Sequence, residues 1–103
     1  MYVSLTRVNN AGQPSENATM VAQEMNRWLR DIEGYHGFLM LFRDEETVGL
    51  TVWESKAVAD LHRDARMQFI ERMTSIAGVQ VEEIVEYEVA FADIGPLLSD
   101  SAS

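Results

Sequence analysis

The spacing of apolar residues in the first third of the chain predicts a strand and then a helix. Residues 2–8 mix Val, Leu, Thr and Tyr with polar positions, which is typical of a strand, and the polar run 9–12 ends it. Pro14-Ser15-Glu16 is typical of a helix start, and apolar residues then recur at three- and four-residue spacing until Gly34 stops the helix. The apolar positions of this predicted helix are Ala18, Val21, Met25, Trp28, Leu29 and Ile32.

The middle of the chain predicts a hairpin and a second helix. Residues 38–42 are apolar at every position, residues 44–47 form a polar turn, and residues 48–53 read as a second strand. Ser55 is a predicted N-cap for a helix that Gly78 ends. Its predicted apolar stripe consists of Val58, Leu61, Ala65, Phe69, Met73 and Ile76, although the polar segment 62–66 leaves open a division into two pieces.

The last predicted element is a long strand over residues 79–91 with one polar face. Val85 and Tyr87 alternate there with glutamates, so we expect the Tyr87 ring to be buried on the apolar face. Glu82, Glu86 and Glu88 would be costly to bury unpaired, and we expect them to reach water or an arginine of a partner subunit.

The resulting order β-α-β-β-α-β predicts a ferredoxin-like α+β fold, a four-stranded antiparallel sheet with both helices on one face. No linker or repeat interrupts it, so we predict a single domain over residues 1–92 and a loose tail over residues 93–103. The first hairpin strand lies at a sheet edge in this topology, yet residues 38–42 leave neither of its faces polar, which invites aggregation unless something covers it. We therefore expect a homodimer, in which a second copy packs its sheet against the open face.

Composition narrows the classes of partner. The chain has no cysteine, which removes disulfides, thiolate nucleophiles and Cys-ligated metal sites. Its formal net charge of -9 repels nucleic-acid phosphates and anionic lipid, and no apolar run approaches the roughly 20 residues of a membrane helix. The first residues lack the pattern of an export signal. We expect a cytoplasmic protein that binds neither nucleic acid nor membrane.

The hairpin FLMLFRDEETVGLTVWES and the helix after it resemble the antibiotic biosynthesis monooxygenase family. The most specific feature is Trp53-Glu54-Ser55, which joins a strand to a helix, and Gly34-Tyr35-His36-Gly37-Phe38 supports it. The likeness spans about residues 3–91. It implies a dimeric α+β barrel, and its members include cofactor-independent oxygenases of polycyclic phenols, haem-degrading monooxygenases, isomerases and proteins of no known activity.

The haem-degrading branch of that family implies an asparagine in the first strand, and a tryptophan and an axial histidine in the second helix. Thr6 stands at the position of the asparagine and His62 at that of the tryptophan, and residues 68–74 contain no histidine. Without an axial ligand the iron is not held in that branch's manner, so we do not expect haem degradation. With haem degradation set aside, the resemblance implies an enzyme that has no bound cofactor.

The side chains that suit such chemistry each have an ordinary structural interpretation as well. His62, at the rim of the apolar stripe, can accept a phenolic proton near neutral pH, or lie exposed on a helix. Arg66, one turn later, can stabilise an oxyanion of the substrate, or pair with Glu71 or another acid on the surface. Trp53, Tyr87 and Thr6 are candidates for binding the substrate, and each is equally an ordinary core or strand residue.

Other chemistries lack their motifs. His36 and His62 have no metal-ligand spacing, and neither a phosphate-binding glycine motif nor a G-x-S-x-G nucleophile motif occurs. Two hypotheses therefore remain. The first is a cofactor-independent monooxygenase of a small aromatic or polyketide-like molecule, and the second is a dimer of the same fold that binds a ligand, or serves in a stress response, without catalysis.

Overall fold

The computed structural model describes residues 1–10 and 15–93, which form one four-stranded antiparallel sheet and its helices. The sheet order is β2-β3-β1-β4, with β2 and β4 at the edges. This confirms the predicted ferredoxin-like α+β topology, with the second helix divided in two. The elements are β1 (Tyr2–Asn9), α1 (Ser15–Leu29), β2 (Tyr35–Arg43), β3 (Glu46–Trp53), α2 (Lys56–Leu61), α3 (Arg63–Ala77) and β4 (Gln80–Glu88).

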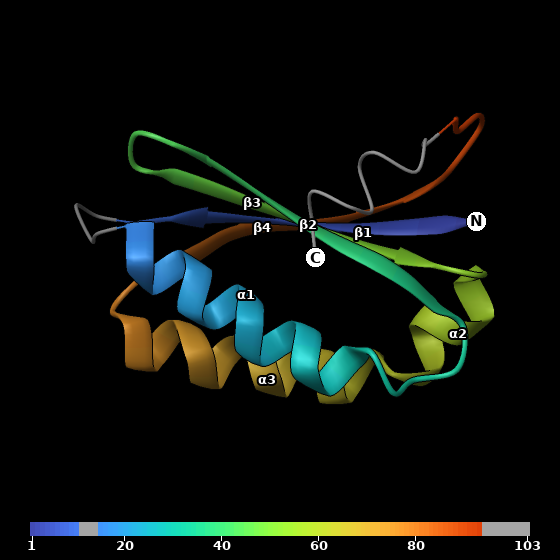
Figure 1. Ribbon diagram of the computed structural model, residues 1–103, viewed down its shortest axis with the longest axis horizontal. Coiled ribbons are helices and arrows are strands. Elements are labelled where there is room, and N and C mark those ends of the chain that lie inside the picture. The colour runs from blue at the N-terminus through green and yellow to red at the C-terminus, as the bar shows by residue number, and fades with distance from the viewer. Residues whose placement is uncertain (11–14, 94–103) are drawn as a thin grey trace.

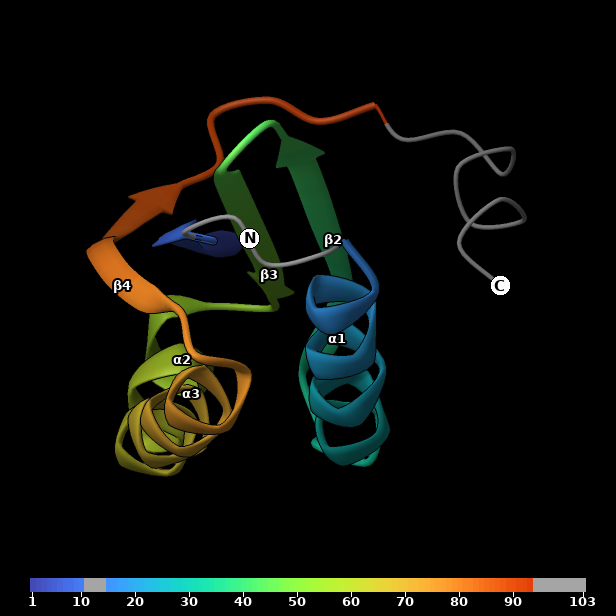
Figure 2. The same cartoon turned by 90° about the vertical axis from the view of Figure 1, so that its left-hand side faces the viewer.

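Both long helices cover the same face of the sheet. α1 and α3 lie side by side below it, and α2 lies near the end of β3 (Figures 1 and 2). The core forms between these layers, because alternate residues of each strand point toward the helices. Its buried members are Tyr2, Met25, Leu29, Trp53 and Ala59. No helix within residues 1–10 and 15–93 is long and apolar enough to cross a bilayer.

The helix boundaries differ in part from those that the sequence predicts. α1 ends at Leu29, and turns over residues 30–34 replace its expected last turn. Gly34 has a φ of +90°, its carbonyl accepts a 2.8 Å hydrogen bond from the Glu54 amide, and an added Cβ would lie 2.8 Å from Val58 Cγ1. The glycine is therefore required by the close packing of the turn against α2 rather than as a helix stop.

The second helix begins and ends where predicted, but its predicted apolar stripe is only partly correct. Val58 and Phe69 pack against the core, whereas other members are exposed. Ser55 caps α2 by accepting a hydrogen bond from the Val58 amide, and Gly78 ends α3 in the left-handed region. Between them the backbone leaves the helical conformation at His62. The residues that follow therefore no longer continue the helical face of the residues before the break. Ala65 and Ile76, which follow the break, are therefore exposed. Leu61, which precedes it, is 77% exposed, and the buried residues of the two helices are Ala59, Arg66 and Ala77.

The hairpin strands are longer than predicted, whereas β4 is shorter. A two-residue turn, Asp44-Glu45, joins β2 to β3, and β4 ends at Glu88 rather than at residue 91. Tyr87 pairs with Val3 on the face of the sheet without helices and is 55% exposed, so its predicted burial is wrong for the single chain. The predicted tail lies, apart from Asp93, outside the described residues.

Most of the face of the sheet opposite the helices is apolar, and its charged residues gather near the hairpin. In each strand, the residues between those that face the core point to this side of the sheet, as the strand register shows. We call it the open face, and no described helix covers it (Figure 2). Its apolar residues are Val3, Leu5, Leu39, Leu41, Val48, Leu50, Val52, Val85 and Tyr87.

Candidate functional site

Trp53 lies at the centre of a cluster of predicted site residues at the α2 end of the sheet. It is fully buried, as expected of a core residue. The Tyr35 ring packs edge-on against it at 6.0 Å, the His62 ring stacks on it at 6.2 Å, and the Arg66 guanidinium lies 5.0 Å from its centroid. The structure therefore brings together Trp53, His62 and Arg66. Tyr87 and Thr6 lie elsewhere.

The break between α2 and α3 positions the imidazole of His62. The backbone amide of His62 donates to the Asp60 carbonyl and closes α2, while its carbonyl accepts the Arg66 amide at 3.0 Å and opens α3. The ring is half-buried and nearly parallel to the Trp53 indole, at 16°. His62 is thus neither a fully exposed helix residue nor part of the core, and one side of its ring is held in place by Trp53.

Arg66 is a buried cation, and the surface pairing considered from the sequence is wrong. Only 1% of its area is exposed, because α3 turns it toward the sheet. Its Nη2 donates to the Ala59 carbonyl at 2.8 Å and lies 3.7 Å from Glu86 Oε1. Burial lowers the pKa of the guanidinium, and the Glu86 carboxylate partly offsets that effect. Two buried donors here, Arg66 Nε and Trp53 Nε1, have no hydrogen-bond partner among the described residues.

Glu86 completes the cluster, in a role that was not predicted from the sequence. Its side chain is 11% exposed. Arg63 Nη1 donates to both of its oxygens at 3.1 Å, and the Tyr2 hydroxyl donates to it at 3.4 Å. The alternation of residues along β4 could have predicted this role. Because Val85 and Tyr87 share the open face, Glu86 must face the helices, where a buried anion needs a cation from its own chain.

A separate apolar cavity of about 50 Å³ lies between the sheet, α1 and α3. Thr6, a candidate for binding the substrate, lines it, and Thr47, Thr51 and Thr74 add further hydroxyl groups. Trp53, His62, Arg66 and Tyr87 do not line it. The cavity is lined by Thr6, Val8, Val21, Met25, Phe38, Met40, Thr47, Gly49, Thr51, Phe69, Ile70 and Thr74.

A larger hollow of about 450 Å³ at the hairpin end of the molecule has a different character. It is wide open and lined mainly by charged residues, among them Arg7, Arg43 and Glu82, so it does not suit an apolar ligand. Within the described part of the chain, no group of three His, Asp or Glu side chains is placed to hold a metal ion. The apolar cavity is therefore the better candidate for a small-molecule site.

Comparison with known proteins identifies the fold. Neither a protein-family model nor a curated protein sequence matches the chain. Among solved structures, a suspected antibiotic biosynthesis monooxygenase from Deinococcus radiodurans has a TM-score of 0.68 at 16% identity, covering 91% of this chain and 97% of the other. SnoaB, a cofactor-independent oxygenase from Streptomyces nogalater, has the same score and identity over 88% of this chain and 94% of its own.

A third solved structure extends the same likeness. It is the monooxygenase encoded by ActVA-Orf6 of Streptomyces coelicolor in complex with Nanaomycin D, with a TM-score of 0.63 at 14% identity over 91% of each chain. At these identities the likeness establishes the arrangement of helices and strands and not the reaction. The chain thus has the fold of the solved antibiotic biosynthesis monooxygenases, as the resemblance of its hairpin predicted.

Proposed function

We propose that this chain is the subunit of a cytoplasmic homodimeric monooxygenase that oxidises a small aromatic or polyketide-like molecule without a bound cofactor. The observation that carries the proposal is the apolar cavity between the sheet and the helices, in a fold shared with a cofactor-independent oxygenase. Apolar walls with a few hydroxyl groups suit a flat ring system that bears carbonyl or hydroxyl substituents. At about 50 Å³ the cavity must widen to admit such a molecule, and the flexible side chains of Met25 and Met40 line it.

The reaction requires a base and a group that stabilises negative charge. The substrate would extend along β3 from Thr51 in the cavity to Trp53, the next residue of that strand that faces the helices. His62 would remove a proton from a phenol or an activated methylene, and Arg66 would stabilise the resulting anion. Dioxygen then accepts electrons from that anion. Conversion of a methylene to a carbonyl incorporates one oxygen atom, and the other leaves as water together with the two hydrogens.

The open face supports the proposed homodimer. Nine apolar side chains lie there side by side, and a monomer in water rarely leaves such a continuous surface uncovered. Residues 89–93, which follow β4, turn to the same side of the sheet (Figures 1 and 2), and Phe91 within them is 86% exposed. A second copy would cover both. Light scattering of the purified protein tests this, with about twice the chain mass of 11.7 kDa expected; a stable species of the single-chain mass would disprove the dimer.

The second hypothesis, binding without catalysis, is favoured by one specific observation. No residue that lines the apolar cavity titrates, so a ligand confined to it would contact neither an acid nor a base. Such a protein would hold its ligand and leave it unchanged. The two hypotheses differ in whether the bound molecule reaches His62.

Oxygen uptake decides between them. Anthrone is a suitable probe, because its methylene can become a carbonyl, and consumption should equal one dioxygen for each anthrone converted to anthraquinone. Replacing His62 by alanine should lower the rate roughly 100-fold or more if it is the base. His36 is the matched control, because it is the other histidine of the chain and is exposed on β2. Saturable binding of a probe with no oxygen uptake would support the second hypothesis, and equal rates in both variants would remove the role of His62.

A further inference from the structure

Four charged side chains of alternating sign cross the open face near the hairpin. They are Arg43 of β2, Glu46 of β3, Arg7 of β1 and Glu83 of β4, and we call them the charge ladder. Arg43 Nη2 lies 3.6 Å from Glu46 Oε2, Arg7 also pairs with Glu46, and Arg7 Nε lies 3.4 Å from Glu83 Oε2. Each strand contributes one member, so the charge ladder closes one end of an otherwise apolar face.

The order of these charges distinguishes the two ways in which the open faces of two copies can stack. A two-fold axis along the strands places one charge ladder over the other in reversed order. Arg43 then lies over the partner's Glu83, and Glu46 over the partner's Arg7, so that all four contacts are attractive. An axis across the strands instead places each charge ladder over the far, apolar end of the other sheet, where its charges lose water without gaining partners.

The sheet edges favour the same axis. β4 is acidic, with Glu82, Glu83 and Glu88, whereas β2 carries His36 and Arg43 and no acid. An axis along the strands brings the β4 edge beside the β2 edge of the partner. An axis across them brings two β4 edges together, which places acid against acid in a protein of net charge -9.

We propose that the second copy docks on the open face about a two-fold axis along the strands, and that the charge ladder selects this orientation. The inference rests on the homodimer of the proposed function. Packed sheets lie about 10 Å apart, a gap that one arginine and one glutamate side chain bridge together. The apolar residues supply the association energy, while the charge ladder excludes the other orientation and unlike partners.

Charge reversal at two positions tests the proposal without any substrate. R43E places a second carboxylate against the partner's Glu83, and E83R places a second guanidinium against the partner's Arg43. Each variant alone should dimerise roughly tenfold more weakly than the natural chain, because two contacts of the dimer become repulsive. An equimolar mixture restores opposite charges at both contacts. Native mass spectrometry should then show heterodimer in roughly tenfold excess over random pairing, and the excess should shrink in high salt.

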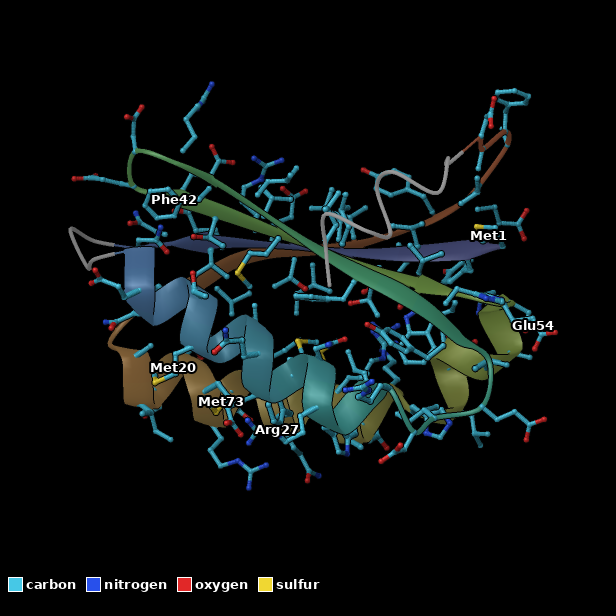
Figure 3. The ribbon with its side chains drawn as sticks, in the orientation of Figure 1. Met1, Met20, Arg27, Phe42, Glu54 and Met73 are labelled. Atoms are coloured by element: carbon cyan, nitrogen blue, oxygen red, sulfur yellow. The ribbon has the colours of Figure 1, made fainter. Side chains whose placement is uncertain are left out.

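The matched control is the pair R27E and E24R, which reverses an equivalent ion pair on α1. Figure 3 shows Arg27 on the side of the helices away from the sheet, so this mixture should pair at random. If R43E or E83R fails to fold in thermal unfolding, R7E mixed with E46R probes the other contact of the charge ladder. A monomeric natural chain would overturn the homodimer itself. A dimeric natural chain whose R43E and E83R variants pair at random would overturn only the charge ladder.

Discussion

The guanidinium carbon of Arg66 lies 5.0 Å from the centroid of the Trp53 indole ring, and both side chains are buried. A desolvated contact of this kind contributes about 2 kcal/mol, and it joins the first turn of α3 to the end of β3. Glu86 joins the same guanidinium to β4. Three elements, β3, α3 and β4, are therefore held together by one buried positive charge and its partners.

Replacing Glu86 by alanine should destabilise the fold by about 3 kcal/mol, because it leaves Arg66 buried without its carboxylate. Arg63 can turn to water, since half of its side chain is already exposed, but Arg66 cannot. Urea unfolding measures the difference. Glu88 is exposed on the same strand, so E88A should stay within about 0.5 kcal/mol of the natural chain. Equal losses in both variants would show that the Arg66 pair contributes little.

Replacing Arg66 by methionine should cost less stability than removal of Glu86. The flexible thioether fills the space beside Trp53, and Glu86 retains its hydrogen bonds from Arg63 and Tyr2. The same variant should lose most oxygenase activity if Arg66 stabilises the substrate anion. Unfolding and oxygen uptake measured on one preparation separate the two roles, and full activity in a stable R66M protein would leave Arg66 a structural role alone.

Stability should decrease as the pH rises above about 10, and Tyr2 should be one cause. Burial, and then the Glu86 carboxylate, raise the pKa of Tyr2 above its ordinary value of 10.0. In that range the unfolded chain loses the phenol proton before the folded chain does, so the folded state binds more protons and a rise in pH favours unfolding. Burial also raises the pKa of Tyr35. Y2F and Y35F should each reduce the alkaline loss in thermal unfolding, and unchanged slopes in both would contradict this account.

Local chemistry could be predicted from the sequence, whereas the pairing of distant groups could not. Ser55 and Gly78 were predicted correctly because an N-cap and a left-handed C-cap depend on residues within a turn or two. The apolar stripe was wrong at Ala65 and Ile76 because a single helical period cannot show that the phase resets at His62. Glu86 was missed because its partners lie on α3 and β1, and only the register of β4 places it against them.

Replacing Gly34 by alanine should destabilise the fold by about 2 kcal/mol for two reasons. Its φ of +90° is unfavourable for a side chain, and the new Cβ would meet both methyl groups of Val58, at 2.8 and 3.0 Å. The turn carries the backbone hydrogen bond from Glu54, so α2 and Trp53 would shift with it. A drop in the unfolding midpoint accompanied by a change in indole fluorescence is expected, and an unchanged midpoint would show that the turn adapts freely.

Replacing Gly49 by alanine should block the cavity while leaving the fold intact. Gly49 lines the cavity, and an added Cβ would meet only the Phe38 ring at an ordinary 3.6 Å. The methyl group should stabilise β3 slightly, by roughly 0.5 kcal/mol, and weaken binding of an aromatic probe on the order of tenfold. Gly37 is the matched control, since an added Cβ there meets nothing within 4 Å. Thermal shifts with anthrone measure binding, with the dimer mass checked for each variant. Loss of binding in G49A but not in G37A would place the ligand under the sheet, whereas equal binding in both would place it elsewhere.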